Sequence, residues 1–141
     1  MSHEGPRVGC GAALVRDGKV LLIQRLKAPE AGCWALVGGK VEWLETVEDT
    51  IIRETLEEVG VQINRLELLT VIDLMDAADQ YHWVSPVYLV EDFTGEPQLM
   101  EPTKHGAVQW FDLDNLPSPV ALAAKQAADR ISRRASSSRG R

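Results

Sequence analysis

Hydrophobic residues along this chain gather in short runs separated by turn residues, which is the pattern of successive β-strands. Asp17-Gly18 lies between the first two runs and favours a tight hairpin turn there. Before the last run, residues 98–106 read as a loop. The strands are expected at residues 8–15, 20–26, 33–37, 66–74, 82–90 and 108–111.

Two other stretches have the period of a helix. The first begins at Thr46, which with Asp49 three residues later resembles a capping box, and it stops at Gly60. A second, alanine-rich amphipathic helix is expected at residues 119–131. This order of strands and helices predicts an α/β (α+β) fold with a mixed sheet and helices on both sides. The core-facing stripe of the first helix is expected to be Ile51, Ile52, Thr55, Leu56 and Val59.

The polar side of the first helix is unusually acidic. Residues 45–60 hold six acids against one base, Arg53. Glu54, Glu57 and Glu58 share one face of the helix, and each like-charged pair costs a bare helix roughly 0.2–0.5 kcal/mol. A bound divalent cation reverses that repulsion, since hard cations take carboxylate oxygens. A solvated acidic face is the ordinary alternative, but interleaved lysines are missing here, so a metal site is favoured.

The spacing from Gly39 to Val61 resembles the Nudix box of MutT-like pyrophosphohydrolases, G-x5-E-x7-R-E-U-x-E-E-x-G-U, where U is bulky and apolar. Thr55 departs from the pattern because an aliphatic residue is usual there. The resemblance implies an α/β/α Nudix sandwich with a central mixed sheet over residues 1–131. It also implies Mg²⁺ as cofactor, with Mn²⁺ as an alternative.

Several site residues follow from this resemblance. Glu45 with Arg53 is interpreted as a structural ion pair supporting the ligands, and Arg53 either holds Glu57 in place or is only its charge partner. The family uses the Glu54 position as metal ligand or as base, so both roles stay open. Glu54 and Glu58, about 40° apart around a helix, rank as the firmest ligands. The implied metal ligands are Gly38 (through its carbonyl), Glu54, Glu57 and Glu58.

A further acid is expected in the loop before the last strand. Glu101 lies where many relatives carry an extra acidic ligand or base, and it joins the candidate catalytic residues Arg53, Glu54, Glu57 and Glu58. Lys104 occupies the position where that acid is often found.

Substrate contacts must come largely from outside the box. Gly39 and Lys40 are candidate phosphate contacts, with an ordinary turn and a solvated lysine as the alternatives. Trp34 and Trp83 could stack on a nucleobase, the alternative for each being core packing. His82 could supply base-edge hydrogen bonds, although His82 and His105 are more often structural histidines than catalysts.

The leading hypothesis is a Mg²⁺-dependent hydrolase that cleaves the pyrophosphate linkage of a nucleoside diphosphate derivative. A (deoxy)nucleoside triphosphate, cleaved to the monophosphate and pyrophosphate, is favoured, and an ADP-ribose or nucleotide-sugar pyrophosphatase is the closest alternative. A non-catalytic nucleotide-binding module is less favoured, because such modules usually lose box acids and none is lost here.

Composition limits the kinds of partner that the protein is expected to have. The chain has 141 residues, with no apolar run near the roughly 20 residues of a membrane span and no signal peptide, so no membrane partner is expected. Cys10 and Cys33 lack metal-ligand spacing and read as reduced thiols of a cytoplasmic protein. The partner is expected to be a small nucleotide, with a homodimer left open.

Charge is distributed unevenly. The net charge is −6, but five arginines lie at residues 130–141, so residues 1–129 hold 10 basic and 21 acidic side chains. Such an acidic body argues against duplex nucleic acid as a partner. Residues 132–141, rich in Ser and Arg, are expected to be a disordered tail.

Overall fold

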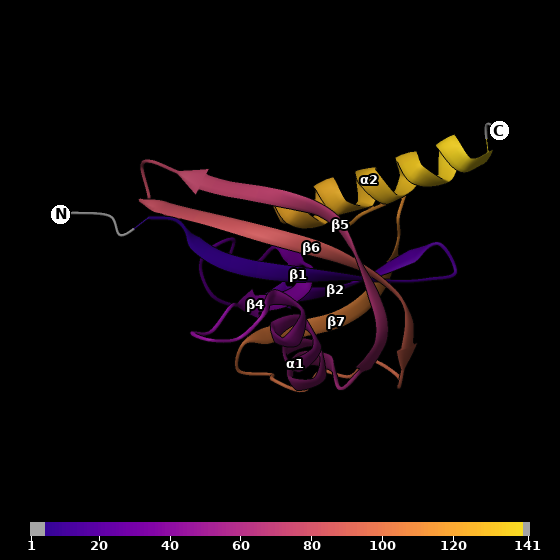
Figure 1. The fold of residues 1–141 in the computed structure, drawn as a ribbon, viewed down its shortest axis with the longest axis horizontal. Helices are drawn as coiled ribbons and strands as arrows, with labels where there is room; N and C mark the ends of the chain where they lie inside the picture. The colour runs from indigo at the N-terminus through magenta and orange to yellow at the C-terminus, as the bar shows by residue number, and fades with distance from the viewer. Residues whose placement is uncertain (1–4, 140–141) are drawn as a thin grey trace.

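The computed structural model describes residues 5–139 and consists of a seven-stranded mixed sheet between two helices (Figure 1). Helix α1 (Val47–Val59) lies below the sheet and helix α2 (Leu122–Arg139) above it. This arrangement confirms the predicted α/β/α fold. The strands are β1 (Arg7–Arg16), β2 (Lys19–Arg25), β3 (Trp34–Ala35), β4 (Val37–Lys40), β5 (Gln62–Asp76), β6 (Tyr81–Thr94) and β7 (His105–Asp112).

Strand β1 is the centre of the sheet. One edge pairs parallel with β6, the other pairs antiparallel with β4, and its end forms a hairpin with β2. Asp17 and Gly18 have φ angles of 54° and 76° in that hairpin, so the expected tight turn is present. The main path runs β3-β2-β1-β6-β5, with β4 added to β1 and β7 added to β2.

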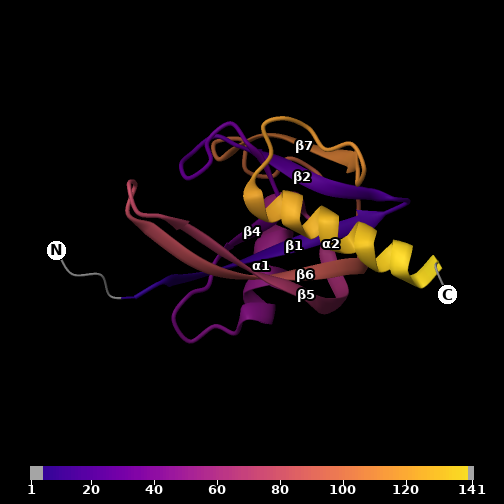
Figure 2. The same cartoon turned by 90° about the horizontal axis from the view of Figure 1, so that it is seen from above.

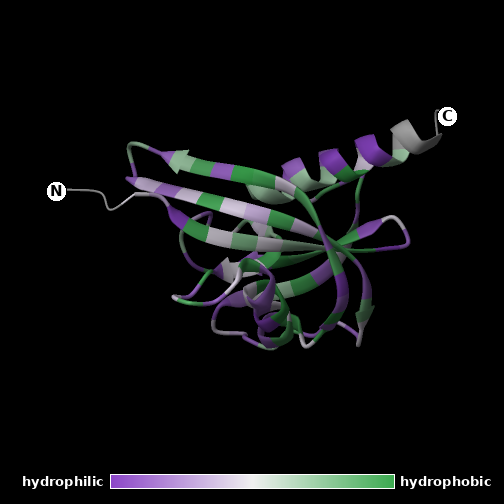
Figure 3. Ribbon diagram, viewed as in Figure 1, coloured by the Kyte–Doolittle hydropathy of each residue, from purple (hydrophilic) through white to green (hydrophobic). Residues whose placement is uncertain are grey.

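Alternate side chains of β1 belong to two separate core clusters, and Figure 3 colours the strands by the hydropathy of their residues. Cys10, Ala12 and Leu14 point into the cluster that includes Ile51 of α1. Ala13 points into the other cluster, which includes alanines of α2. Because successive side chains of a strand point to opposite faces, one nearly all-apolar strand supports both helices.

Helix α1 has the ends that the sequence predicts. The Thr46 side chain accepts a hydrogen bond from the Asp49 N–H, and Gly60 ends the helix in the left-handed conformation. The expected core stripe is only partly correct, since Leu56 is 48% exposed while Glu58 is buried. Leu56 lies about 100° around the helix from Thr55, so a buried face that includes Glu58 turns Leu56 outward.

The β5–β6 hairpin is longer than its apolar pattern. The sequence predicts residues 66–74 and 82–90, whereas the strands extend to Asp76 and from Tyr81, with their tip far from α1 in Figure 1. Residues near the tip are largely exposed, so hydrophobic alternation does not mark them.

Helix α2 crosses over the sheet when the molecule is viewed from above (Figure 2) and includes residues 132–139, for which the sequence predicts a disordered tail. Extending an existing helix needs no new nucleation, and Ala, Ser and Arg are all compatible with it. Arg134 also lies 3.7 Å from Glu67 of β5. Residues 140–141 fall outside the described part. No described helix is long and apolar enough to span a membrane.

Candidate active site

Two adjacent glycines of β4 bring the backbone against α1. A side chain at Gly38 would overlap the carbonyl oxygen of Cys10 on the neighbouring strand, so the β1–β4 pairing requires glycine there. A Cβ at Gly39 would lie 2.6 Å from the carboxyl carbon of Glu54. The bare backbone of this strand therefore leaves room for carboxylates of the helix.

Glu58 is the most deeply buried acid of α1. Its Oε1 accepts a hydrogen bond of 2.8 Å from the Gly38 N–H, and its Oε2 lies 3.3 Å from Nε2 of His105. The side chains of Glu58 and His105 are only 8% and 5% exposed. Glu58 thus links the helix to β4 and β7, strands from two parts of the sheet.

Glu54 lies between the buried acid and the single arginine of the helix. Burial, followed by the nearby charge of Glu58, raises the pKa of Glu54 above its usual value. Arg53 opposes this shift, donating from Nη1 to Glu54 Oε1 at 3.0 Å. Burial and a like-charged neighbour both disfavour the ionised form of Glu54. A cation bound beside the carboxylate would favour that form.

Arg53 organises the outer acids. It donates to both carboxylate oxygens of Glu45 at 2.8 and 2.9 Å, so the expected structural ion pair is present, and to Glu57 at 3.2 Å. The Thr50 hydroxyl donates to Glu45 at 2.6 Å. The Arg53 and Thr50 hydrogen bonds lower the pKa of Glu45 to about 2, while Glu45 raises the pKa of Arg53.

The loop before β7 is attached to the end of α1. Carbonyls of Val59 and Glu58 accept hydrogen bonds from the N–H groups of Gln98 and Met100, at 2.9 and 3.3 Å. These contacts satisfy carbonyls that the end of a helix leaves free. The loop then turns through Glu101, whose carbonyl accepts from the His105 N–H at 3.0 Å.

This turn gathers three groups of metal-ligand type. One ligand atom each of Glu58, Glu101 and His105 lies within 4.8 Å of the others. Lys104 contacts the Glu101 carboxylate at 3.4 Å, so it acts as a charge partner of the loop acid. Sequence reasoning placed Glu101 near the site but missed His105, because no local pattern connects β7 to α1.

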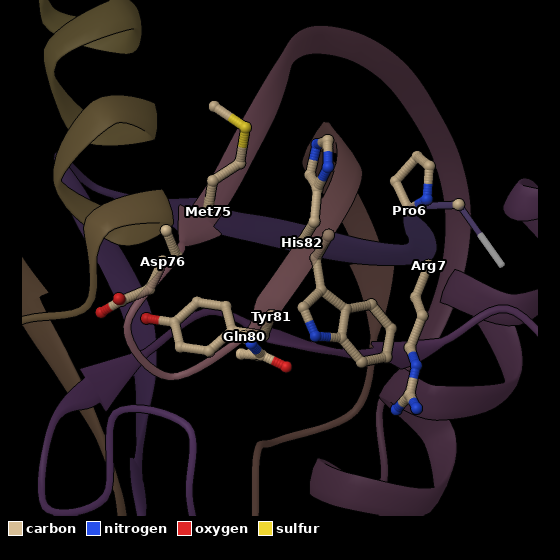
Figure 4. Close-up of a pocket in the computed structure, with 10 residues that line it drawn as sticks. Pro6, Arg7, Met75, Asp76, Gln80, Tyr81 and His82 are labelled. Atoms are coloured by element: carbon tan, nitrogen blue, oxygen red, sulfur yellow. The ribbon is translucent and has the colours of Figure 1, made fainter. Parts of the chain in front are cut away.

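One cavity adjoins strand β4 and another adjoins the tip of the β5–β6 hairpin. The smaller, about 230 Å³, is bordered by Gly38, Gly39, Lys40 and Trp83 among others. The larger, about 960 Å³, lies at the tip of the β5–β6 hairpin, where His82 and Trp83 border it (Figure 4). Trp83 belongs to both, and the Arg7 guanidinium lies 5.7 Å from its ring centroid.

Trp34 does not join these residues. Its ring meets Phe111 edge-on at 4.8 Å and packs against the core cluster beneath α2. Its neighbours Ala35 and Leu36 border the smaller cavity instead. The expectation that Trp34 could stack on a base therefore differs from the structure, in which β3 directs this side chain into packing.

The donor set fits a hard divalent cation. Glu54 and Glu58 place carboxylates beside the backbone of Gly38 and Gly39, and Glu101 adds a third acid. Carboxylate and carbonyl oxygens suit Mg²⁺ and Mn²⁺. The Gly39 position supports this fit directly, since any side chain there would fill the space beside the Glu54 carboxylate.

Comparison with known proteins agrees with the fold and the box. Residues 5–134 match the NUDIX domain. A crystal structure of a MutT NUDIX hydrolase from Burkholderia pseudomallei is 55% identical, with a TM-score of 0.88 over 91% of this chain and 99% of that one. The NUDIX domain of Shewanella oneidensis NrtR complexed with ADP ribose is 25% identical, with a TM-score of 0.78 over 94% and 90%.

Among curated proteins, an ADP-ribose pyrophosphatase of Methanocaldococcus jannaschii is 38% identical over 112 residues, which is 79% of this chain. The match spans 65% of that relative's length. The chain belongs to the NUDIX hydrolase family, whose enzymes hydrolyse pyrophosphate bonds of nucleotides.

Proposed function

We propose that this protein hydrolyses the pyrophosphate linkage of a nucleoside diphosphate derivative with the help of Mg²⁺ or Mn²⁺. The observation that carries the proposal is the packing of the Glu54 and Glu58 carboxylates against the Gly38-Gly39 backbone, which also borders a cavity. Glu54, Glu57 and Glu58 would hold the cation, together with the Gly38 carbonyl.

The bound cation would neutralise phosphate oxygens and make an attacking water more acidic. The protein's own groups would position the reactants around it. Lys40, exposed at the end of β4, supplies a positive charge for a phosphate. Glu101 is the candidate acceptor for the water proton, since its side chain is 27% exposed and adjoins Glu58. Arg53 holds Glu57 and Glu54 in place.

The first candidate substrate is a (deoxy)nucleoside triphosphate, cleaved to the monophosphate and pyrophosphate. The 55% identity to a MutT hydrolase over 99% of that chain supports it. The test is product analysis with purified protein and Mg²⁺ across nucleoside triphosphates, their deoxy and oxidised forms, ADP-ribose and nucleotide sugars. Release of pyrophosphate with a monophosphate from one triphosphate would support this candidate, and inertness of all triphosphates would exclude it.

A second candidate is ADP-ribose or a nucleotide sugar. The observation that favours it is the larger cavity beyond Trp83, which offers room for a second moiety on the far side of the pyrophosphate. The 38% identity to an ADP-ribose pyrophosphatase supports it too. In the same panel, formation of two monophosphate products without pyrophosphate would identify this class.

Trp83 is the proposed platform for a base. Trp83→Ala should raise KM much more than it lowers kcat, because stacking binds the ground state and the transition state alike. One stack is worth about 1–3 kcal/mol, or roughly 5- to 150-fold in kcat/KM. Trp34→Ala is the matched control: it should lower the melting temperature and affect all substrates equally. The loss should be large for nucleotides and absent for a base-free substrate such as inorganic tripolyphosphate, if that is cleaved, and equal losses for both would exclude stacking.

A further inference from the structure

Among the described residues, the His105 ring has its polar contact with a proposed metal ligand. His105 is 4% exposed, and its Nε2 lies 3.3 Å from Oε2 of Glu58. The other ring nitrogen, Nδ1, is buried and has no hydrogen-bond partner among the described residues. A buried histidine with a purely structural role is expected to have its polar atoms satisfied. This ring leaves one atom unsatisfied while contacting Glu58.

The carboxylate of Glu58 is thereby held from two sides. The Gly38 N–H donates to Oε1 at 2.8 Å, and the His105 ring faces Oε2. The two groups come from β4 and β7, so neither can follow the side chain if it rotates. A glutamate that is already fixed loses less conformational freedom when it binds a cation. Partners of this kind commonly change metal affinity or activity 10- to 100-fold when removed.

We infer that His105 is a positioning residue that holds Glu58 in its metal-binding orientation through the contact of Nε2 with the Glu58 carboxylate. The inference rests on the proposed role of Glu58 in holding the cation. A direct ligand role for the imidazole is less favoured. Histidines that bind metals almost always donate their second ring N–H to a partner, and Nδ1 of His105 has none among the described residues.

Two amide substitutions separate the two ring nitrogens. His105→Gln places an N–H near the position of Nε2, whereas His105→Asn, one methylene shorter, reaches only toward the position of Nδ1. Both variants keep a polar side chain of similar size, so neither leaves an apolar patch beside the acids. Val108→Ala, also on β7 and packed against the core, is the control for a general loss of stability.

The measurement is the dissociation constant of Mn²⁺ for the full chain without nucleotide, obtained from the electron paramagnetic resonance signal of free Mn²⁺. We expect His105→Asn to weaken binding by about 10- to 100-fold. His105→Gln and Val108→Ala should stay close to wild type, although Val108→Ala should lower the melting temperature. In a Glu58→Gln background, the Asn and Gln variants should bind Mn²⁺ equally, because the positioned carboxylate is gone.

Equal Mn²⁺ affinities of the Asn and Gln variants in the wild-type background would overturn the inference. So would a difference between them that persists unchanged with Glu58→Gln, since His105 would then act through another group. Because no substrate is present, this result is independent of turnover. A protein that binds Mn²⁺ as expected but cleaves no nucleotide would contradict the proposed activity and leave the role of His105 intact.

Discussion

Glu57 and Glu58 are neighbours in the chain, yet their surroundings differ sharply. The Glu57 side chain is 50% exposed and pairs with Arg53, which also holds Glu45 and Glu54. The Glu58 side chain is 8% exposed and has no Lys or Arg ion pair among the described residues. The outer acids therefore carry their own counter-charge, whereas the inner acid has no Lys or Arg counter-charge among the described residues.

The largest expected effect is on turnover, when the buried acid Glu58 is replaced. Glu58→Gln should lower kcat by at least about 10²-fold at saturating Mg²⁺, because charge held at a developing transition state is worth several kcal/mol. Glu54→Gln should behave alike. Glu57→Gln, at the exposed side, should cost less, about tenfold, since Arg53 can still order the remaining acids. Steady-state kinetics on the preferred nucleotide measures all three.

Metal-free stability is the control for these variants. Removing one of several clustered acids relieves repulsion, so the melting temperature without Mg²⁺ should hold or rise in Glu58→Gln and Glu54→Gln. Near wild-type turnover for both Glu58→Gln and Glu54→Gln would mean that the catalytic acids lie elsewhere.

The two glycines of β4 should separate stability from activity. Gly38→Ala forces a Cβ into the Cys10 carbonyl and should destabilise the fold by about 3 kcal/mol. Gly39→Ala meets the movable end of Glu54, so it should lower kcat with little change in melting temperature. Thermal unfolding and kinetics on the two variants provide the comparison. An equal loss of stability in both would show that the carboxylate cannot move aside.

Replacing Thr55 is expected to have a smaller effect, and to stabilise the protein instead of destabilising it. Its hydroxyl is fully buried and has no hydrogen-bond partner within residues 5–139, at the box position where an aliphatic residue is usual. Thr55→Val removes that unsatisfied group at nearly constant shape and should stabilise the protein by about 1 kcal/mol. Calorimetry should show a higher melting temperature, with kcat unchanged. A lower melting temperature would indicate that the hydroxyl forms a bond in solution.

The smallest expected effect is on stability at low pH. The pKa of Glu45 is lowered from 4.5 to about 2, mainly by Arg53, so its stabilising contribution is complete above pH 4.5 and is lost as the pH falls toward 2. Glu45→Gln lacks this contribution at every pH. The difference in melting temperature between wild type and Glu45→Gln should therefore shrink across that window. A difference that stays constant would show that the ion pair is not coupled to folding.

The sequence predicts well what depends on local spacing. Thr46 and Gly60 end α1 as expected, and Asp17-Gly18 forms the expected hairpin, because turns and caps are set by a few adjacent residues. The Glu45–Arg53 pair also follows from spacing, since both ends belong to one motif.

Long-range packing accounts for what the sequence does not predict. Trp34 and Trp83 look alike as candidates, and only the sheet shows that Trp34 packs on Phe111 while Trp83 borders the cavities. His105 reaches Glu58 through a loop attached to the end of α1, a contact between residues 47 positions apart with no local signal. The rotation of α1 that buries Glu58 and exposes Leu56 likewise depends on the sheet against which the helix packs.

The most direct test of the account is hydrolysis in ¹⁸O-labelled water, followed by mass spectrometry of the products. With Mg²⁺, the wild-type protein should place ¹⁸O in one phosphate-containing product of a nucleoside diphosphate derivative. Omission of the cation should abolish labelling, and Glu58→Gln should reduce its rate by at least about 10²-fold. Label incorporation that proceeds equally without divalent cations, or equally in Glu58→Gln, would contradict a metal-assisted site at α1 and β4.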